Sequence, residues 1–232
     1  MFEMLGESTF WVSVLQIIMI DILLGGDNAV VIALACRSLP EEQRKKGIFW
    51  GVVGAIGLRV ALIAFALQIL DIPFLKLAGG LLLLWIGMQL LVGEDDDGHD
   101  VQGSTHLWGA VKTIIVADAV MSFDNVIAVA GASHGSLALV VFGIVISIPI
   151  IVWGSQLVLK LMDRFPIVIT LGGGLLGWIG GSMLLSDKGV LDYTGMLPGW
   201  SHQVAGAIGA ALVVLTGSML AKRKALASAR AE

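Results

Sequence analysis

Two short stretches of the sequence place carboxylate and amide side chains inside otherwise apolar segments. The first is DILLGGDNAVVIA, residues 21–33, and the second is DAVMSFDNVIAVA, residues 118–130. They align without gaps at an offset of 97 residues, and both read D-x5-D-N followed by small and branched apolar residues. The shared polar residues are Asp21, Asp27, Asn28, Asp118, Asp124 and Asn125. All six side chains carry oxygen atoms, the ligands that hard divalent cations prefer.

The aspartates of both stretches are costly to keep in an apolar segment. One aspartate at the centre of a membrane helix costs about 2.5–3.5 kcal/mol on insertion scales, so four amount to roughly 10 kcal/mol. Protons, basic partners or a bound cation must compensate for this cost. One alternative is therefore that the carboxyl groups are protonated and hydrogen-bonded. Asp21 and Asp118 are the two aspartates that most readily orient the metal ligands instead of binding the metal themselves.

An all-oxygen shell of four carboxylates and two amides suits Mg²⁺, Ca²⁺ or Mn²⁺. No histidine or cysteine lies near either motif, which argues against zinc and copper. Met19 and Met121 flank the motifs, and we expect them to be packing residues.

The spacing within the first motif also predicts a local feature of the backbone. Asp21 and Asp27 are six residues apart, about 120° round a regular helix. Their carboxyl groups would lie closer together if the helix were unwound between them. Gly25 and Gly26 favour such unwinding because glycine has weak helical propensity. We therefore expect the helices that carry the motifs to be broken or bent just before Asp27 and Asp124.

The composition is that of a polytopic α-helical membrane protein. Of the 232 residues, 57% are hydrophobic and 14% are charged, and the mean hydropathy is +0.92; a soluble protein would be about 25% charged. The net charge of −4 gives no indication of nucleic-acid binding, and the single cysteine, Cys36, excludes internal disulfides. Hydropathy predicts seven transmembrane helices, at residues 10–36, 47–70, 73–92, 108–132, 136–160, 166–186 and 203–221.

A second internal match divides these spans into two copies. GGLLLLWIG, residues 79–87, matches GGGLLGWIG, residues 172–180. Each copy then holds three spans, so the second copy enters the membrane from the opposite side, as in the inverted repeats of many secondary transporters. The predicted division is a first three-helix repeat at 1–92, an acidic cytoplasmic loop at 93–107, a second, inverted repeat at 108–187, and a seventh helix with a basic tail at 188–232.

The basic residues outside the spans predict the orientation. With the N-terminus outside, the inner side receives Arg37, Arg44, Lys45, Lys46, Lys112, Lys160, Arg164, Lys222, Arg223, Lys224 and Arg230. The outer side receives only Lys76 and Lys188. This asymmetry predicts a multi-pass protein of the inner (plasma) membrane with its N-terminus outside and its C-terminus in the cytoplasm.

Two further charged features complete the pattern. Arg59 lies inside the second span, where we expect one of the motif carboxylates to be its partner. The basic tail AKRKALASAR is expected to anchor the last helix at the anionic inner leaflet.

The segments GGDNAVVIALA and SFDNVIAVAG, one in each half, resemble the motifs of the TerC family of integral membrane proteins, named from tellurium resistance. The family belongs with the lysine-exporter superfamily, and the likeness covers essentially the whole chain. The resemblance implies manganese(II) export and a role in supplying metal to secreted enzymes. It also implies that the metal-site residues are Asp27, Asn28, Asp124 and Asn125, followed by Asp21 and Asp118.

These features predict a secondary transporter, not an enzyme, that exports a divalent cation, with Mn²⁺ as the ion favoured by the resemblance. Moving a cation outward costs about 2.3 kcal/mol per charge per 100 mV, so export needs a driving force, and exchange for protons would supply it. No prosthetic group is expected. The partners considered besides the ion and the bilayer are a second copy of the chain, the secretion machinery and exported metalloenzymes.

Three rival functions stay open. A membrane partner that supplies metal to exported enzymes is compatible with transport, whereas a passive cation channel would ignore a proton gradient. An intramembrane aspartyl protease also needs two facing carboxylates, and LLGGD, residues 23–27, is similar to a G-x-G-D site. Such a dyad has no use for an asparagine beside each aspartate.

Overall fold

The computed structural model describes residues 8–65, 72–92, 104–132, 137–195 and 197–231, and the regular structure in these ranges is helical. In chain order the helices are α1 (Ser8–Cys36), α2 (Glu41–Ala64), α4 (Leu75–Val92), α5 (Ser104–Ala132), α6 (Leu137–Arg164), α7 (Ile167–Leu185), α8 (Lys188–Thr194) and α9 (Gly199–Ala231). The side chains of Asp21, Asp124 and Asn125 lie outside the described part of the molecule. The predicted all-α fold is confirmed.

The long helices coincide with the predicted spans. Within the described residues, five of them (α2, α4, α6, α7 and α9) are long and apolar enough to cross a membrane. Helices α1 and α5, of 29 residues each, fall on the predicted spans 10–36 and 108–132. Only some of their side chains are described, so the count of seven spans stays a prediction. Helix α2 ends at Ala64, before the predicted limit at residue 70.

The predicted break before Asp27 and Asp124 is wrong, and the alternative of a bend at these places stays a prediction. Helix α1 runs without interruption from Ser8 to Cys36, and α5 runs likewise from Ser104 to Ala132. Backbone N–H and C=O groups have no water to bond with inside a bilayer, so a continuous helix that satisfies them internally is favoured even across Gly25 and Gly26. The backbones of Asp21 and Asp27 therefore lie in one continuous helix, and those of Asp118 and Asp124 in another.

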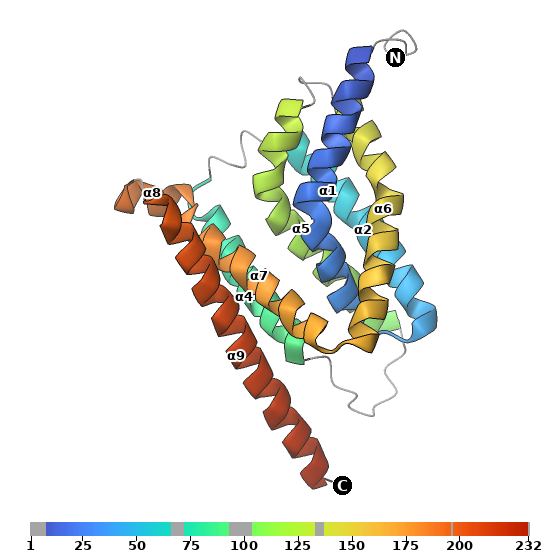
Figure 1. Cartoon of the computed structure of the whole chain (residues 1–232), viewed down its shortest axis with the longest axis vertical. Helices are drawn as coiled ribbons and strands as arrows, with labels where there is room; N and C mark the ends of the chain where they lie inside the picture. Colours follow the sequence, from blue (N-terminus) through green and yellow to red (C-terminus); the bar gives the residue numbers. More distant parts are fainter. Residues whose placement is uncertain (1–7, 66–71, 93–103, 133–136, 196, 232) are drawn as a thin grey trace.

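The helices form two groups that lie side by side (Figure 1). In the four-helix group, α1 packs on α6 and on α5, and α2 packs on α5. In the three-helix group, α7 packs on α9 and on α4, and α4 also packs on α9. Figure 1 shows α1 descending from the N-terminus while α5 runs in the opposite direction beside it. The two motif-bearing helices are thus antiparallel neighbours.

Two isoleucines, each four residues before one of the aligned stretches, make equivalent contacts. Ile17 of α1 is fully buried, and a Cβ atom added at Gly143 of α6 would lie 2.5 Å from its Cγ2 atom. Ile114 of α5 is 97 residues further along and 1% exposed, and a Cβ atom added at Gly51 of α2 would lie 2.5 Å from its Cδ1 atom. Each glycine therefore lets the first helix of one half approach the second helix of the other.

Glycines also bring α7 and α9 into backbone contact. A Cβ atom added at Gly177 would lie 2.5 Å from the carbonyl oxygen of Gly209, and one at Gly181 would overlap the carbonyl oxygen of Ala205. The spacing of Gly173, Gly177 and Gly181 is the small-residue pattern of close helix pairs in membranes. Gly177 and Gly181 form the surface on which α9 packs, whereas Gly173 faces Leu91 of α4.

The Gly177→Ala variant is expected to lose about 1–3 kcal/mol of stability because the new methyl group meets backbone that has no room to move. Gly57→Ala is the matched control, since a Cβ atom at Gly57 meets nothing within 4 Å. Alanine has the higher helical propensity, so the control should lose nothing. Thermal unfolding of the two purified variants in one detergent measures the difference; equal unfolding temperatures would mean that α9 is not held this closely.

Asp187, a buried aspartate without a predicted role, connects the start of α4 to the start of α8. Asp187 is 1% exposed and caps α8, with Oδ1 accepting from the N–H groups of Gly189 (2.8 Å) and Val190 (3.3 Å). The same carboxylate accepts hydrogen bonds from the start of α4, at Phe74 (2.9 Å), Lys76 (3.0 Å) and Leu77 (3.3 Å). It thereby fixes Phe74, whose φ of 65° is unusual for a residue with a side chain.

The pKa of Asp187 reflects both its burial and these bonds. Burial by itself raises the pKa, but the backbone N–H groups of the α4 and α8 starts together outweigh it and hold the pKa below its usual value. A carboxyl group whose pKa is lowered by folding stabilises the fold above its unfolded pKa, near 3.9, and loses that contribution as the pH falls through the folded pKa.

Replacing Asp187 by alanine is expected to lower the free energy of unfolding by about 2–4 kcal/mol at neutral pH, because several backbone donors lose their acceptor. Asp192→Ala, an exposed aspartate of the same short helix, is the control and should change little. Unfolding at pH 7 and below pH 4 tests the charge, since the difference between wild type and Asp187→Ala should shrink in acid. A difference that is independent of pH would contradict this role.

Candidate metal centre

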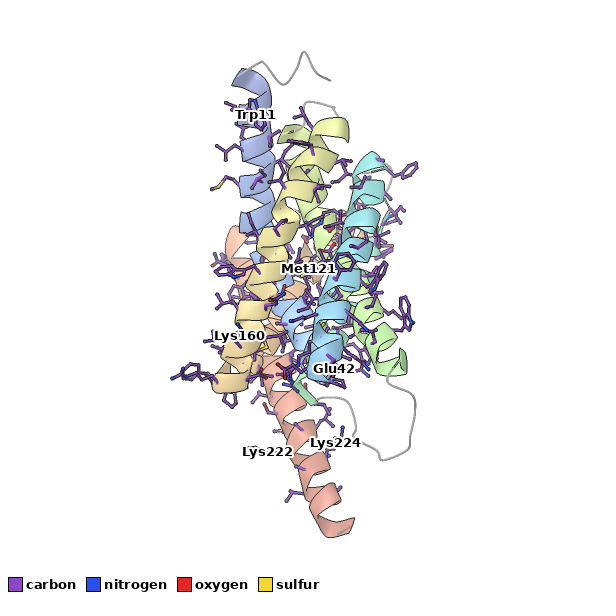
Figure 2. The ribbon with its side chains drawn as sticks, turned by 90° about the vertical axis from the view of Figure 1, so that its right-hand side faces the viewer. Trp11, Glu42, Met121, Lys160, Lys222 and Lys224 are labelled. Carbon is purple, nitrogen blue, oxygen red and sulfur yellow. The ribbon has the colours of Figure 1, made fainter. Side chains whose placement is uncertain are left out.

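A layer of polar side chains divides the core of the four-helix group. One apolar cluster on one side includes Val14, Ile17, Ile63, Val129 and Ile144, and the larger cluster on the other side includes Val31, Ala55, Ile114, Met121 and Ile151. Between them along each helix lie the buried polar residues Asn28 of α1, Arg59 of α2, Ser122 of α5 and Ser147 of α6. Figure 2 shows Met121 about midway between Trp11 near one end and Glu42 and Lys160 near the other. The polar layer therefore lies deep within the bundle.

Asp27 and Asn28 bring one carboxylate and one amide to this layer from α1. Asp27 is partly buried, and its Oδ1 atom accepts a hydrogen bond from the backbone N–H of Asn28 at 2.9 Å. The side chain of Asn28 is 2% exposed, and neither its oxygen nor its nitrogen has a hydrogen-bond partner among the described residues. A buried amide without partners is costly, so its presence calls for a ligand, a water molecule or an ion at this position.

Arg59 and Asp118 form the buried ion pair of the layer. An Nη2–H group of Arg59, which is 3% exposed, donates to Oδ1 of Asp118. Arg59 also donates from Nε to the hydroxyl oxygen of Ser122 at 3.1 Å, and that hydroxyl group donates to Oδ2 of Asp118 at 3.3 Å. The prediction that a motif carboxylate is the partner of Arg59 is confirmed, and the ion pair joins α2 of the first half to α5 of the second.

Ser122 also belongs to this network, although the sequence predicted no role for its side chain. It aligns with Gly25 of the first motif, and its buried hydroxyl group supports both Arg59 and Asp118. The two motifs therefore differ chemically at this position, even though their Asp-Asn pairs match.

Asp27 interacts electrostatically with both members of the ion pair, Arg59 and Asp118. The structure thus brings together described polar side chains of both motifs. Among the described residues, no three carboxylate, imidazole or thiolate groups converge on one point. Of the six predicted ligands, the structure describes the side chains of Asp27, Asn28 and Asp118, whereas those of Asp21, Asp124 and Asn125 lie outside the described part. The full ligand shell stays a prediction.

The two methionines beside the motifs have ordinary environments. Met121 belongs to the larger apolar cluster and is 5% exposed, and Met19 is 49% exposed on the outside of the bundle. Met121 is therefore a packing residue, as expected, and Met19 faces the surroundings of the bundle.

A family description, "Integral membrane protein TerC family", matches residues 6–225. The chain is 49% identical to "Uncharacterized membrane protein YjbE" of Bacillus subtilis (strain 168), over 78% of this chain and 83% of that protein. It is also 26% identical to "Uncharacterized membrane protein YkoY" of the same organism, over 75% of this chain and 60% of that protein. No solved structure matches it significantly.

One of the relatives is a longer protein than this chain. The "UPF0053 inner membrane protein YoaE" of Escherichia coli (strain K12) is 26% identical over 95% of this chain, which spans only 45% of that relative. The match of the family description covers nearly the whole chain, including both Asp-Asn motifs. The chain is therefore a member of the TerC family of integral membrane proteins.

Proposed function

We propose that the chain is a secondary transporter that exports a divalent metal cation, with Mn²⁺ as its cargo, in exchange for protons. The observation that carries this proposal is the amide of Asn28, buried and without a partner among the described residues, next to the carboxylate of Asp27. Carboxylate and amide oxygens in that position are ligands of the kind that Mn²⁺, Mg²⁺ and Ca²⁺ prefer. The remaining proposed ligands are Asp118 and the undescribed side chains of Asp21, Asp124 and Asn125.

The contacts between the halves support the inverted-repeat architecture. In this proposal α1, α2 and α4 form the first repeat and α5, α6 and α7 the second. The pairing of α1 with α6 then corresponds to the pairing of α5 with α2, down to the equivalent isoleucines Ile17 and Ile114 in their glycine contacts. Sites of inverted-repeat transporters lie where the repeats meet, and the polar layer lies between α1 and α5.

Arg59 acts in the proposal as the counter-ion of the metal-free state. It neutralises Asp118 now, and a divalent cation bound by Asp118 would take its place. Protons are the other cations that the carboxylates accept, so binding of metal and binding of protons exclude each other. This competition is the basis of exchange transport, and a proton gradient directed into the cell would drive the cation outward.

Purified protein in proteoliposomes tests the exchange. Mn²⁺ entering the lumen should raise the lumenal pH, and an acidic lumen should accelerate Mn²⁺ uptake, with saturation as the concentration rises. The same vesicles with Mg²⁺ and Ca²⁺ rank the three ions. Saturable Mn²⁺ uptake that leaves the lumenal pH unchanged and ignores an imposed pH gradient would refute proton exchange, and non-saturating flux would indicate a channel.

A further inference from the structure

A second polar site lies away from the metal centre, at the end of the bundle where α1 and α4 end. It is a pocket of about 810 Å³ between α1, α4, α5 and α9. Its lining combines the apolar side chains of Trp85 and Met88 with three cations, Arg37, Arg223 and Lys224. None of the described residues that line it is acidic.

Of the three cations that line the pocket, Arg37 is the one whose side chain most requires an anionic partner. Burial lowers the pKa of its guanidinium group, which indicates that part of its hydration has been lost. Among the described residues its guanidinium group has no hydrogen-bond acceptor, whereas the neighbouring Arg44 is bonded to Asp163 at 3.0 Å. A guanidinium group carries five N–H donors that match the oxygens of a phosphate.

The apolar part of the pocket adjoins the outer surface of the bundle. Trp85 is 52% exposed and Leu220, which also lines the pocket, is 48% exposed. Both lie on helices long and apolar enough to cross a membrane, α4 and α9. Lys224 lies toward the lower end of α9 in Figure 2, below most of the other helices. A molecule in the pocket would therefore have its charged part among the cations and its apolar part along α4 and α9.

We propose that this pocket binds an anionic phospholipid, with the phosphate held by Arg37, Arg223 and Lys224. Basic pockets between membrane helices on the cytoplasmic side are typical sites for such headgroups. The combination of three cations with apolar side chains favours a lipid over a small soluble anion, which would gain nothing from Trp85, Met88 and Leu220. The proposal is independent of what the metal centre transports.

Native mass spectrometry of the purified, delipidated full chain tests the site. Phosphatidylglycerol should bind more tightly than phosphatidylcholine with the same acyl chains. The double variant Arg37→Gln/Arg223→Gln should weaken phosphatidylglycerol binding about twenty-five-fold, from about fivefold for each cation removed. Lys222→Gln is the matched control, because Lys222 is an exposed neighbour on α9 that does not line the pocket.

Three results would overturn the proposal. The first is equal binding of the anionic and zwitterionic lipids, and the second is an equal loss of affinity in the Lys222→Gln control. The third is displacement of phosphatidylglycerol by millimolar inorganic phosphate, which would identify a site for a soluble anion. Unfolding temperatures of all variants, measured without lipid, verify that each is folded. Mn²⁺ transport is measured separately, so failure of lipid binding leaves the proposed transport function untouched.

Discussion

Inverted membrane vesicles that contain the Asp27→Asn variant are expected to take up Mn²⁺ at less than about a tenth of the wild-type rate. Asparagine has the same shape and keeps one oxygen atom, but in the proposed exchange it could supply neither the negative charge that would attract the cation nor the group that would accept a proton. Loss of even about 1.4 kcal/mol of interaction with the ion corresponds to a tenfold effect. Asp124→Asn is expected to have the same effect, because Asp124 holds the matching place in the second motif.

Asp163→Asn makes the same chemical change outside the polar layer. Asp163 is 50% exposed and pairs with Arg44 at 3.0 Å at the end of the bundle, where an ion pair contributes little to stability. This control should transport Mn²⁺ at the wild-type rate. Undiminished uptake in both Asp27→Asn and Asp124→Asn, at equal protein levels, would end the transport proposal.

The largest loss of stability is expected from Arg59→Met. Methionine is similar in length but leaves the carboxylate of Asp118 buried without its counter-ion and Ser122 without its donor. Breaking a buried ion pair by removing one partner costs about 3–5 kcal/mol. Thermal or denaturant unfolding in a fixed detergent measures the loss.

A double variant separates the ion pair from simple packing. In Arg59→Met/Asp118→Asn neither residue is charged, so most of the lost stability should return. Arg59→Lys keeps the charge but cannot donate from two nitrogens to Asp118 and Ser122 in the same geometry, and it should fall between wild type and Arg59→Met. A double variant as unstable as the sum of its two single variants would contradict the ion pair as the source of stability.

The helices and the depth of the polar layer were predictable from the sequence because hydropathy and helix length depend on local composition. That the partner of Arg59 is a carboxylate was predictable, because a buried guanidinium group needs an anionic partner. The structure identifies this carboxylate as Asp118. The continuity of α1 differs from the prediction because the need to satisfy backbone groups inside a membrane outweighs the low helical propensity of Gly25 and Gly26.

The role of Asp187 could not be predicted for a different reason. Its acceptor bonds reach Phe74, Lys76 and Leu77, more than a hundred residues earlier in the chain, and no spacing rule connects such distant positions. The partial signal was local: an aspartate directly before a short helix is a typical N-cap. Its other role, accepting hydrogen bonds from the start of α4, depends entirely on how the helices of the three-helix group pack.

Binding of Mn²⁺ to the purified protein tests most directly whether the two halves share one ion. Titration followed by electron paramagnetic resonance of free Mn²⁺ should give one bound ion per wild-type chain. Asp27→Asn and Asp124→Asn should each lose that ion, because each removes a ligand from the same shell. Wild-type stoichiometry and affinity in either single variant would show that the halves do not enclose a common cation.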